Sequence, residues 1–413
     1  MSRSFDVIVL GAGMVGVSVA VHLQSRGRAV ALVDRKPAGS ETSMGNGGLI
    51  QREGVVPYPF PREPSRLLRY ARNNAPELRY HPRDLPRMAS FLWNYWRNSA
   101  PTRHRRIARL YEPLIRHCVE EHRALATPAG ALDLLRPSGW MRIYRSAAAL
   151  EAELREMRRS ADEFGVAYEG LDAAALERSE PALRRGLAGA VRYLDPMACS
   201  DPQALVQAYA DYFARLGGSL LRGDASTLRE AWSVRCEHGE IEAAEAVVAL
   251  GPWAQPLTRR LGLKLPLAVK RGYNMHYTLP ADGALRQPVL DAERGYLLAP
   301  MRRGLRLTTG AELAHLDAAP TPRQLDAVEP FARELLPLGR RLDEQPWMGQ
   351  RPCTPDMMPL IGPAPRLRGL WLAHGHAHHG FTLGPVTGRL LAEMMCGQPT
   401  FVDPAPYAPA RFA

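Results

Sequence analysis

The stretch FDVIVLGAGMVG, residues 5–16, decides the fold of this chain. It begins with a short apolar, β-branched run that predicts a buried strand, and it then enters a turn with three glycines. The apolar side chains of residues 17–26 recur at helical spacing, and residues 29–33 predict a second strand that ends in Asp34. This order of strand, glycine turn, helix, strand and acid is the fingerprint of a βαβ unit that binds an adenine dinucleotide.

Each residue type in this unit has a physical role. Gly11 permits the tight turn, Gly13 lets backbone N–H groups approach a pyrophosphate, and Gly16 lets the helix lie close to the strand. The N-terminus of the helix offers partial positive charge to the phosphates. Asp34 can accept hydrogen bonds from ribose hydroxyls and would repel a 2′-phosphate, which disfavours NADP. The unit itself leaves FAD and NAD open.

Length and composition limit the remaining possibilities. A chain of 413 residues, 46% of them hydrophobic, predicts two domains with sizeable cores. The five cysteines lie far apart and form no CxxC pair, which is typical of reduced thiols in a cytoplasmic protein. Residues 1–4 lead directly into the first strand, so we expect no signal peptide, and no apolar run is long enough to cross a bilayer.

The net charge of +11 comes almost entirely from arginine, because Lys36, Lys264 and Lys270 are the only lysines. A bias that runs through the whole chain indicates genome composition rather than a surface that binds nucleic acid. The excess charge still allows weak attraction to an anionic membrane surface.

Two segments after the βαβ unit have unusual compositions. Residues 35–50 are rich in glycine and small polar residues but end in apolar Leu49-Ile50, which favours a loop that wraps the cofactor over a plain surface loop. Residues 57–126 are basic and helical, and they carry aromatic side chains at positions 91, 93, 95 and 96. These aromatics either form an interfacial element that meets lipid or a quinone, or pack inside the protein. Their spacing gives no single apolar face, so the sequence leaves both alternatives open.

Strand patterns dominate the rest of the chain. Residues 245–250 predict a buried strand that runs into Gly251-Pro252-Trp253, and ligands of open α/β sheets gather at such strand ends. Residues 269–309 alternate in a way that predicts a largely antiparallel sheet. A helix is expected from about residue 383 to residue 396, close to the C-terminus.

Three neighbouring C-terminal stretches carry the most specific motifs. They are GQRPCTPDMMPLIG (349–362), the strand LWLA (370–373) and the loop HGHAHHGFT (374–382). Together with the glycine turn, ETSMGNGGLI (41–50) and ALGPW (249–253), their order resembles the D-amino-acid oxidase and dehydrogenase superfamily of FAD enzymes, which includes glycine oxidase and sarcosine oxidase. The similarity is greatest to the bacterial D-amino-acid dehydrogenases and covers nearly the whole chain.

The resemblance implies a fold and its division. We expect an α/β protein with a Rossmann-type FAD-binding domain and an inserted α+β substrate domain built on a largely antiparallel sheet. The FAD-binding domain takes residues 1–50, 198–265 and 346–413, and the substrate domain takes residues 51–197 and 266–345.

The resemblance also implies a substrate site. Arg351 matches the arginine that holds the substrate carboxylate, a task that suits a planar guanidinium because it pairs bidentately. Tyr296 matches a tyrosine near the substrate in glycine oxidase-like members, and Tyr273 is a weaker candidate of the same kind. His378 stands where relatives carry an arginine or a small polar residue, which leaves the preferred substrate side chain open.

FAD is expected to be bound without a covalent link. Cys353 lies three residues before Asp356, whereas the tethering cysteine of sarcosine-oxidase relatives lies seven before the matching acid, where this chain has Gly349. The expected FAD contacts are Gly11, Gly13, Met14, Val15, Gly16, Asp34, Arg35, Thr42, Ser43, Asn46, Gly47, Gly48, Leu49, Ile50, Ala225, Gly251, Trp253, Gly375, His376, His379, Gly380, Phe381 and Thr382.

The expected activity is oxidation of the amine of a D-amino acid, cyclic ones such as D-proline or D-hydroxyproline included, with electrons passed to a quinone or another carrier. The alternatives are an O₂-using oxidase of glycine or sarcosine, and a basic flavoprotein that binds RNA. A metal site at His374, His376 and His378 is disfavoured, because no acid or cysteine lies near them in the sequence. We expect a cytoplasmic protein with peripheral contact to the inner membrane face and no nucleic-acid partner.

Overall fold

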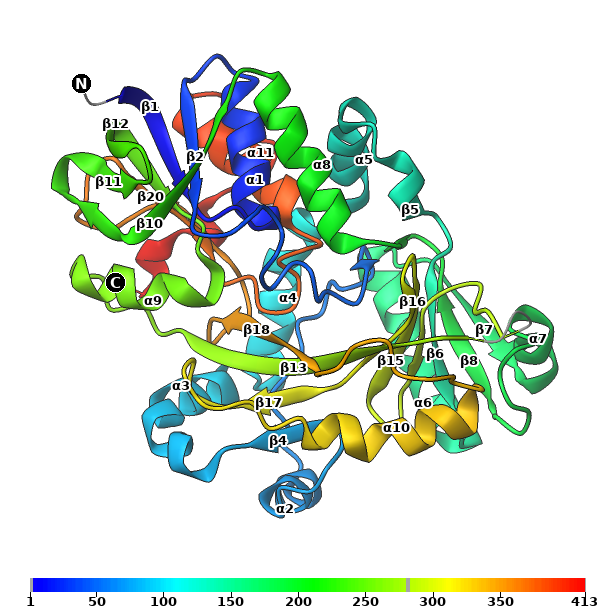
Figure 1. Ribbon diagram of the computed structural model, residues 1–413. Coiled ribbons are helices and arrows are strands. Elements are labelled where there is room, and N and C mark those ends of the chain that lie inside the picture. Colours follow the sequence, from blue (N-terminus) through cyan, green and yellow to red (C-terminus); the bar gives the residue numbers. More distant parts are fainter. Residues whose placement is uncertain (1–2, 280–282, 413) are drawn as a thin grey trace.

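The computed structural model describes residues 3–279 and 283–412, apart from the side chains of Arg3 and Glu230. Figure 1 shows two sheets in two layers, with the N-terminal βαβ unit in one layer and the insertion in the other. The βαβ unit is formed by β1 (Arg3–Leu10), α1 (Met14–Gln24) and β2 (Val30–Asp34). The predicted order of the first thirty residues is therefore confirmed.

The first sheet is parallel at its centre. β1 pairs with β2 on one side and with β12 on the other, and β10 and β20 continue the parallel array beyond them. Its further strands are β10 (Ser219–Arg229), β11 (Ser233–Cys236), β12 (Gly239–Val248), β19 (Leu360–Pro363) and β20 (Leu370–His374). β1 is fully buried from Val7 to Leu10, so this sheet forms a core rather than a surface.

Helices from distant parts of the sequence cover one face of this sheet. They are α1, α5 (Cys118–Ala129), α8 (Pro202–Arg215) and α11 (Gly384–Met395), and the short α9 (Ala254–Arg260) packs on the opposite face. α11 lies directly against α1 because Gly388 faces the backbone of Ser18, where a Cβ atom would come within 2.6 Å. The first and the last α-helix of the chain are thereby packed against each other next to the glycine turn.

The second sheet is largely antiparallel, as predicted, with parallel pairs only at β14–β6 and β17–β4 among the described residues. Its strands are, in spatial order, β4 (Leu78–Tyr80), β17 (Ala311–Leu313), β13 (Ala268–Tyr277), β16 (Gly304–Thr308), β15 (Tyr296–Met301), β14 (Val289–Asp291), β6 (Trp140–Tyr144), β8 (Gly189–Tyr193) and β7 (Tyr168–Asp172). Helix α10 (Arg323–Leu335) packs on one face of it.

One strand departs from the predicted division of the chain. β18 (Trp347–Cys353) pairs with β13 over seven residues and so joins the second sheet, although the sequence analysis placed residues from 346 onward with the FAD-binding domain. The pattern of residues 346–353 gave no sign of a partner strand some 80 residues earlier in the chain. Arg351 therefore projects from the second sheet.

The remaining elements join the two layers and cover the second. They are β3 (Leu49–Ile50), β5 (Leu135–Arg136) and β9 (Met197–Cys199) in a small sheet, and the helices α2 (Pro64–Ala71), α3 (Leu85–Asn98), α4 (Pro101–Ile115), α6 (Ala147–Phe164) and α7 (Ala173–Ser179). Across the ranges that the structure describes, no helix is both long and apolar enough to span a bilayer.

The aromatic residues of α3 divide between the two predicted alternatives. Phe91 and Tyr95 are buried, so part of the set packs inside the protein. Trp93 is 58% exposed and stacks on Trp96 at a centroid distance of 5.2 Å. The helix thus presents apolar surface to the core and to solvent at once.

Candidate active site

A cavity of about 1750 Å³ runs between the two sheets. One end is formed by the glycine turn, Asp34 and Trp253, and the other by side chains of β13, β18 and the loop after β20. Its size is well beyond that of an ordinary drug-sized pocket, so it can hold a dinucleotide together with a small molecule.

At the glycine turn, backbone groups are held in place by polar side chains. The Asp34 carboxylate accepts hydrogen bonds from Ala12 N at 2.7 Å and Lys36 N at 2.9 Å, and Ser43 Oγ accepts one from Met14 N at 3.0 Å. Gly11 has a φ of +105°, and a Cβ atom on Gly16 would collide with the Gly11 carbonyl. Only glycine fits these two positions, which leaves the backbone of the turn open to a ligand such as a pyrophosphate.

The loop that follows β2 is tied to both layers. Thr42 Oγ1 donates to Gln350 O at 3.1 Å, and Arg306 of β16 donates to the carbonyl oxygens of Met44 and Asn46. Gly45 leaves room for the ring of Trp347, with which a Cβ atom would collide. These contacts hold residues 41–50 as one wall of the cavity.

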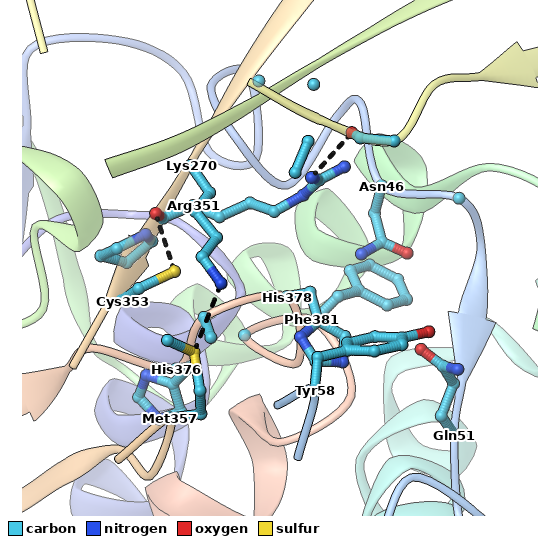
Figure 2. Close-up of a pocket in the computed structure, with 18 of the residues that line it drawn as sticks. Asn46, Gln51, Tyr58, Lys270, Arg351, Cys353, Met357, His376, His378 and Phe381 are labelled. Carbon is cyan, nitrogen blue, oxygen red and sulfur yellow. Dashed lines mark hydrogen bonds between the residues drawn. The ribbon is translucent and has the colours of Figure 1, made fainter. Parts of the chain in front are cut away.

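Arg351 lies at the other end of the cavity on β18 (Figure 2). Its guanidinium lies against Gly272, where a Cβ atom would come within 2.5 Å of Nη2, and it donates to Gly310 O at 3.2 Å. Burial lowers the pKa of this guanidinium from its ordinary value. Among the described residues, no carboxylate pairs with this half-buried cation, and a guanidinium partly removed from water without an anion favours the binding of one.

Lys270 of β13 stands directly opposite Arg351 in the strand pairing. Its ammonium group donates to Tyr95 Oη at 2.9 Å and lies 4.0 Å from the centre of the Tyr95 ring. The Tyr95 hydroxyl in turn donates to Tyr58 O at 2.7 Å. This relay connects the cavity with the segment 57–62, a strap that contains three prolines.

The strap is fastened to α3 and α4 along its length. His104 Nε2 donates to Pro57 O at 2.7 Å, and Phe60 N donates to Ser99 Oγ at 2.7 Å. Tyr58 is 48% exposed, and its ring lies 4.6 Å from that of His378, over the mouth of the cavity. Figure 2 shows Tyr58 and His378 facing the hollow that Lys270 and Arg351 enter from the other side.

The loop after β20 carries buried, neutral histidines. Burial is the largest cause that lowers the pKa of His374 to about 4 and of His376 and His379 to about 3. The pKa of His378 lies well below its usual range because of burial and because of the positive charges of Arg351 and Lys270. Ala377 N donates to Pro352 O at 2.8 Å, so this loop is bonded directly to β18.

The structure places most of the predicted FAD contacts on the cavity wall. Those that line it are Gly11, Gly13, Met14, Val15, Asp34, Arg35, Thr42, Ser43, Asn46, Gly47, Leu49, Ala225, Gly251, Trp253, His376, Gly380 and Phe381. Behind this wall lie Gly16, Gly48, Ile50, Gly375, His379 and Thr382. They shape it instead: Thr382 Oγ1 joins the two loops through Leu49 O at 3.2 Å and Gln51 N at 3.3 Å.

The two predicted tyrosines need correction. Tyr296 does not face the cavity, because alternation along β15 turns its ring toward α10, where its hydroxyl donates to Phe331 O at 3.1 Å. The neighbouring Leu297 lines the cavity instead. Tyr273 borders the cavity, but its hydroxyl donates to Glu312 at 2.7 Å on the opposite face of β13. Neither hydroxyl is placed to meet a substrate.

Arg351 and His378 are brought together as predicted residues of one site, and Tyr58, Lys270 and Gln51 join them unforeseen. Strand alternation from Arg351 could have indicated Lys270 once the pairing partner was known. Nothing in the composition of the strap singled out Tyr58.

The residues present fit an adenine dinucleotide. The glycine cradle accepts a pyrophosphate, and both ring nitrogens of His374, which lines the cavity, are buried without a hydrogen-bond partner among the described residues. The same residues bring no group of three or more metal-ligating side chains together.

Comparison with known proteins gives a consistent result. The family model described as FAD dependent oxidoreductase (DAO) matches residues 6–394. The chain is 30% identical to a D-amino-acid oxidase of Bradyrhizobium diazoefficiens over 100% of both chains. It is also 30% identical to a D-amino acid dehydrogenase of Chromohalobacter salexigens, over 99% of this chain and 100% of that one.

Solved structures share the fold. Glycine oxidase from Geobacillus kaustophilus superimposes with a TM-score of 0.75 at 22% identity, with 100% of each chain covered. L-proline dehydrogenase from P. horikoshii has a TM-score of 0.75 at 19% identity, over 100% of this chain and 98% of that one.

The buried histidines predict a loss of stability in acid. Their pKa is lower in the folded state than the unfolded value of about 6.5, so the unfolded state binds more protons as the pH falls. Stability is therefore full above about pH 6.5 and declines below it, by up to about 2 kcal/mol for each such histidine at pH 5. Thermal melting between about pH 7.5 and pH 5 measures this decline.

A pair of variants assigns the decline to the loop. His374→Asn should reduce the difference in melting temperature between the two pH values, whereas His238→Asn, at an exposed turn, should leave it as it is. A melting temperature that does not change with pH would contradict the prediction.

Proposed function

Because this chain belongs to the DAO family of FAD-dependent oxidoreductases, we propose that it is a dehydrogenase that oxidises the amine of a D-amino acid. The observation that carries the proposal is Arg351, a half-buried guanidinium in the cavity without a carboxylate partner among the described residues. Its planar fork suits the bidentate binding of an amino-acid carboxylate.

FAD is the cofactor of this family, and when bound it accepts the two electrons that the substrate loses. We propose that it is held without a covalent link by the first sheet with α1, α8 and α11, while the second sheet forms the substrate domain. Cys353 is a free thiol that lines the cavity, but Gly349 stands where the tethering cysteine of covalent relatives would be, which supports FAD bound without a covalent link.

The chain's own residues supply binding and orientation. Arg351 anchors the carboxylate, so that the amine-bearing carbon is held inside the cavity with one orientation. His378 is neutral, since its pKa is far below 7, and it can accept a hydrogen bond from the amine without keeping the proton. Tyr58 shields this space from solvent. The carbon gives up hydride and the nitrogen gives up a proton, and water hydrolyses the resulting imine to a 2-oxo acid and ammonia.

The first test is reduction of a dye by the purified yellow protein with D- and L-amino acids, D-proline and D-hydroxyproline included. The proposal expects activity with D-amino acids and little hydrogen peroxide under air. If none of these compounds reduces the protein, the proposal is refuted. If one hydrogen peroxide forms for each substrate oxidised, the protein is an O₂-using oxidase instead.

Arg351→Met tests the anchor. Removal of one partner from a buried, hydrogen-bonded charge pair should raise the KM by about 30-fold or more. Arg351→Lys keeps the positive charge but loses the planar pair of N–H donors. Its KM should lie between the KM of Arg351→Met and that of the unchanged protein. The matched control is Arg158→Met, because Arg158 is an exposed residue of α6. A KM for Arg351→Met equal to that of the control would remove Arg351 from the proposal.

We further propose that the electron acceptor is a quinone, met at an anionic membrane surface. Helix α2 buries none of its residues, and it presents Leu68, 64% exposed, between Arg66 and Arg69. An eight-residue helix with no buried face gains stability from a surface that accepts it. Both arginines also line the cavity, so the same helix borders the path to the substrate site.

Vesicle flotation tests this proposal. The protein should float with vesicles that contain about one-third anionic lipid and not with neutral ones, and added salt should weaken binding. Leu68→Glu combined with Trp93→Glu should abolish flotation. Leu194→Glu, at another exposed leucine, is the control and should float. Equal flotation of both variants, or none by the unchanged protein, would contradict the proposal.

A further inference from the structure

Two cations enter the substrate end of the cavity side by side. Lys270 and Arg351 are directly opposite in the antiparallel pair of β13 and β18, so both side chains project from the same face of the sheet. Figure 2 shows that the two side chains diverge as they enter the hollow, with the Lys270 ammonium directed toward Met357 and the Arg351 guanidinium away from it, and with Tyr58 and His378 across from them. Both residues line the cavity.

Within the described residues, neither cation is neutralised by an acid. Lys270 contacts the Tyr95 hydroxyl and Met357 Sδ, at 2.9 and 3.9 Å, so at most two of its three N–H groups have partners and one of these is a weak sulfur acceptor. Four of the acids that line the cavity pair with other cations: Glu41 with Lys36, Glu77 with Arg69, Glu153 with Arg142 and Glu163 with Arg109.

The positive charge of Lys270 and Arg351 affects the pKa values of the neighbouring His378 and Cys353. Burial and His379 lower the pKa of His378 most, and the positive charges of Arg351 and Lys270 lower it further; burial raises the pKa of Cys353, and the same two charges oppose that rise. His378 is therefore neutral and does not add a third charge. Like charges directly opposite each other on two strands are destabilising unless an anion lies between them.

The proposed substrate neutralises only one of these charges. If Arg351 takes the carboxylate next to the amine, Lys270 remains in the cavity with a free donor and no anion. A purely structural lysine that rests on the Tyr95 ring would not need to point its ammonium group into a ligand cavity, where desolvation is costly.

We propose that the substrate carries a second carboxylate, which Lys270 binds while Arg351 holds the first. This inference rests on the proposed function and narrows its substrate to amino acids with two carboxylates, on the side chain as in D-aspartate and D-glutamate or on the nitrogen as in N-carboxymethylglycine. Tyr95 is the positioning residue, since it fixes the ammonium group by its ring and its hydroxyl.

Matched pairs of substrates test the inference on the FAD-loaded enzyme. D-glutamate and D-glutamine, or D-aspartate and D-asparagine, differ in one charge but hardly in size, and N-carboxymethylglycine against N-methylglycine tests the nitrogen position. The kcat/KM ratio of acid to amide should be about ten or more, and Lys270→Met should lower that ratio by about ten- to a hundredfold. Lys270→Arg should preserve it. Lys264→Met removes the same charge from an exposed position and should not change the ratio.

Ligand binding gives a readout without turnover. Titration of the oxidised enzyme with glutarate or glutaramate, followed by flavin absorbance, should give a dissociation constant about tenfold or more lower for glutarate. Lys270→Met should abolish the difference. If that variant does not fold, equal affinity of the unchanged enzyme for both compounds is enough to overturn the inference.

The outcomes separate this inference from the proposed function. Oxidation of neutral D-amino acids with no preference for the acids would leave the function standing and refute the second carboxylate. The same holds if Lys270→Met slows acids and amides equally, since a structural lysine would do so. Tight binding of glutarate by an enzyme that no amino acid reduces would refute the function and support the two-cation site.

Discussion

The register of β13 against β18 is the constraint on which the proposed substrate site depends. Successive side chains of a strand point to opposite faces, so a slip of one residue would exchange every side chain across the sheet. In the observed register, Lys270 and Arg351 face the cavity, whereas Arg271 faces the other way and pairs with the buried Glu312 at 2.6 Å. The Tyr273 hydroxyl bonds the same carboxylate. A buried polar cluster that is satisfied in only one register can therefore fix which residues meet the substrate.

The cofactor end depends on close helix packing instead. Gly16 lets α1 approach the glycine turn, and Gly388 lets α11 approach α1. The last helix, which follows the histidine loop, is thus fastened to the first helix, which follows the glycine turn. Helices α1 and α11, which lie near opposite ends of the sequence, are therefore held together beside one cavity by close backbone contacts that only glycine permits.

The sequence predicted correctly the elements that depend on local periodicity. The βαβ unit, the antiparallel insertion and the final helix follow from periodicity, and Arg351 and His378 lie at the cavity as the resemblance implied. The prediction for Tyr296 was wrong because the first four residues of β15 are all buried. Apolar residues therefore lie on both faces of the strand, and the sequence does not show which of them face the cavity. Lys270 and Tyr58 were missed because their roles arise from a long-range strand pairing and from a strap held by α3 and α4. The pairing of β18 with β13 was missed for the same reason, since pairing over such a distance leaves no local trace in the sequence.

Recognition and access lie in separate parts of the molecule. β18 and the histidine loop are bonded to each other through Pro352 O and Ala377 N, so the surface proposed to distinguish one substrate from another is held in place by the backbone. Tyr58, by contrast, lies on a proline-rich strap that is tied to neighbouring helices by single hydrogen bonds to its backbone. If β13 and β18 bind the substrate as proposed, the consequence is evolutionary: the sequence of the strap can diverge and alter how fast molecules enter and leave, while the two strands beneath it keep the same substrate preference.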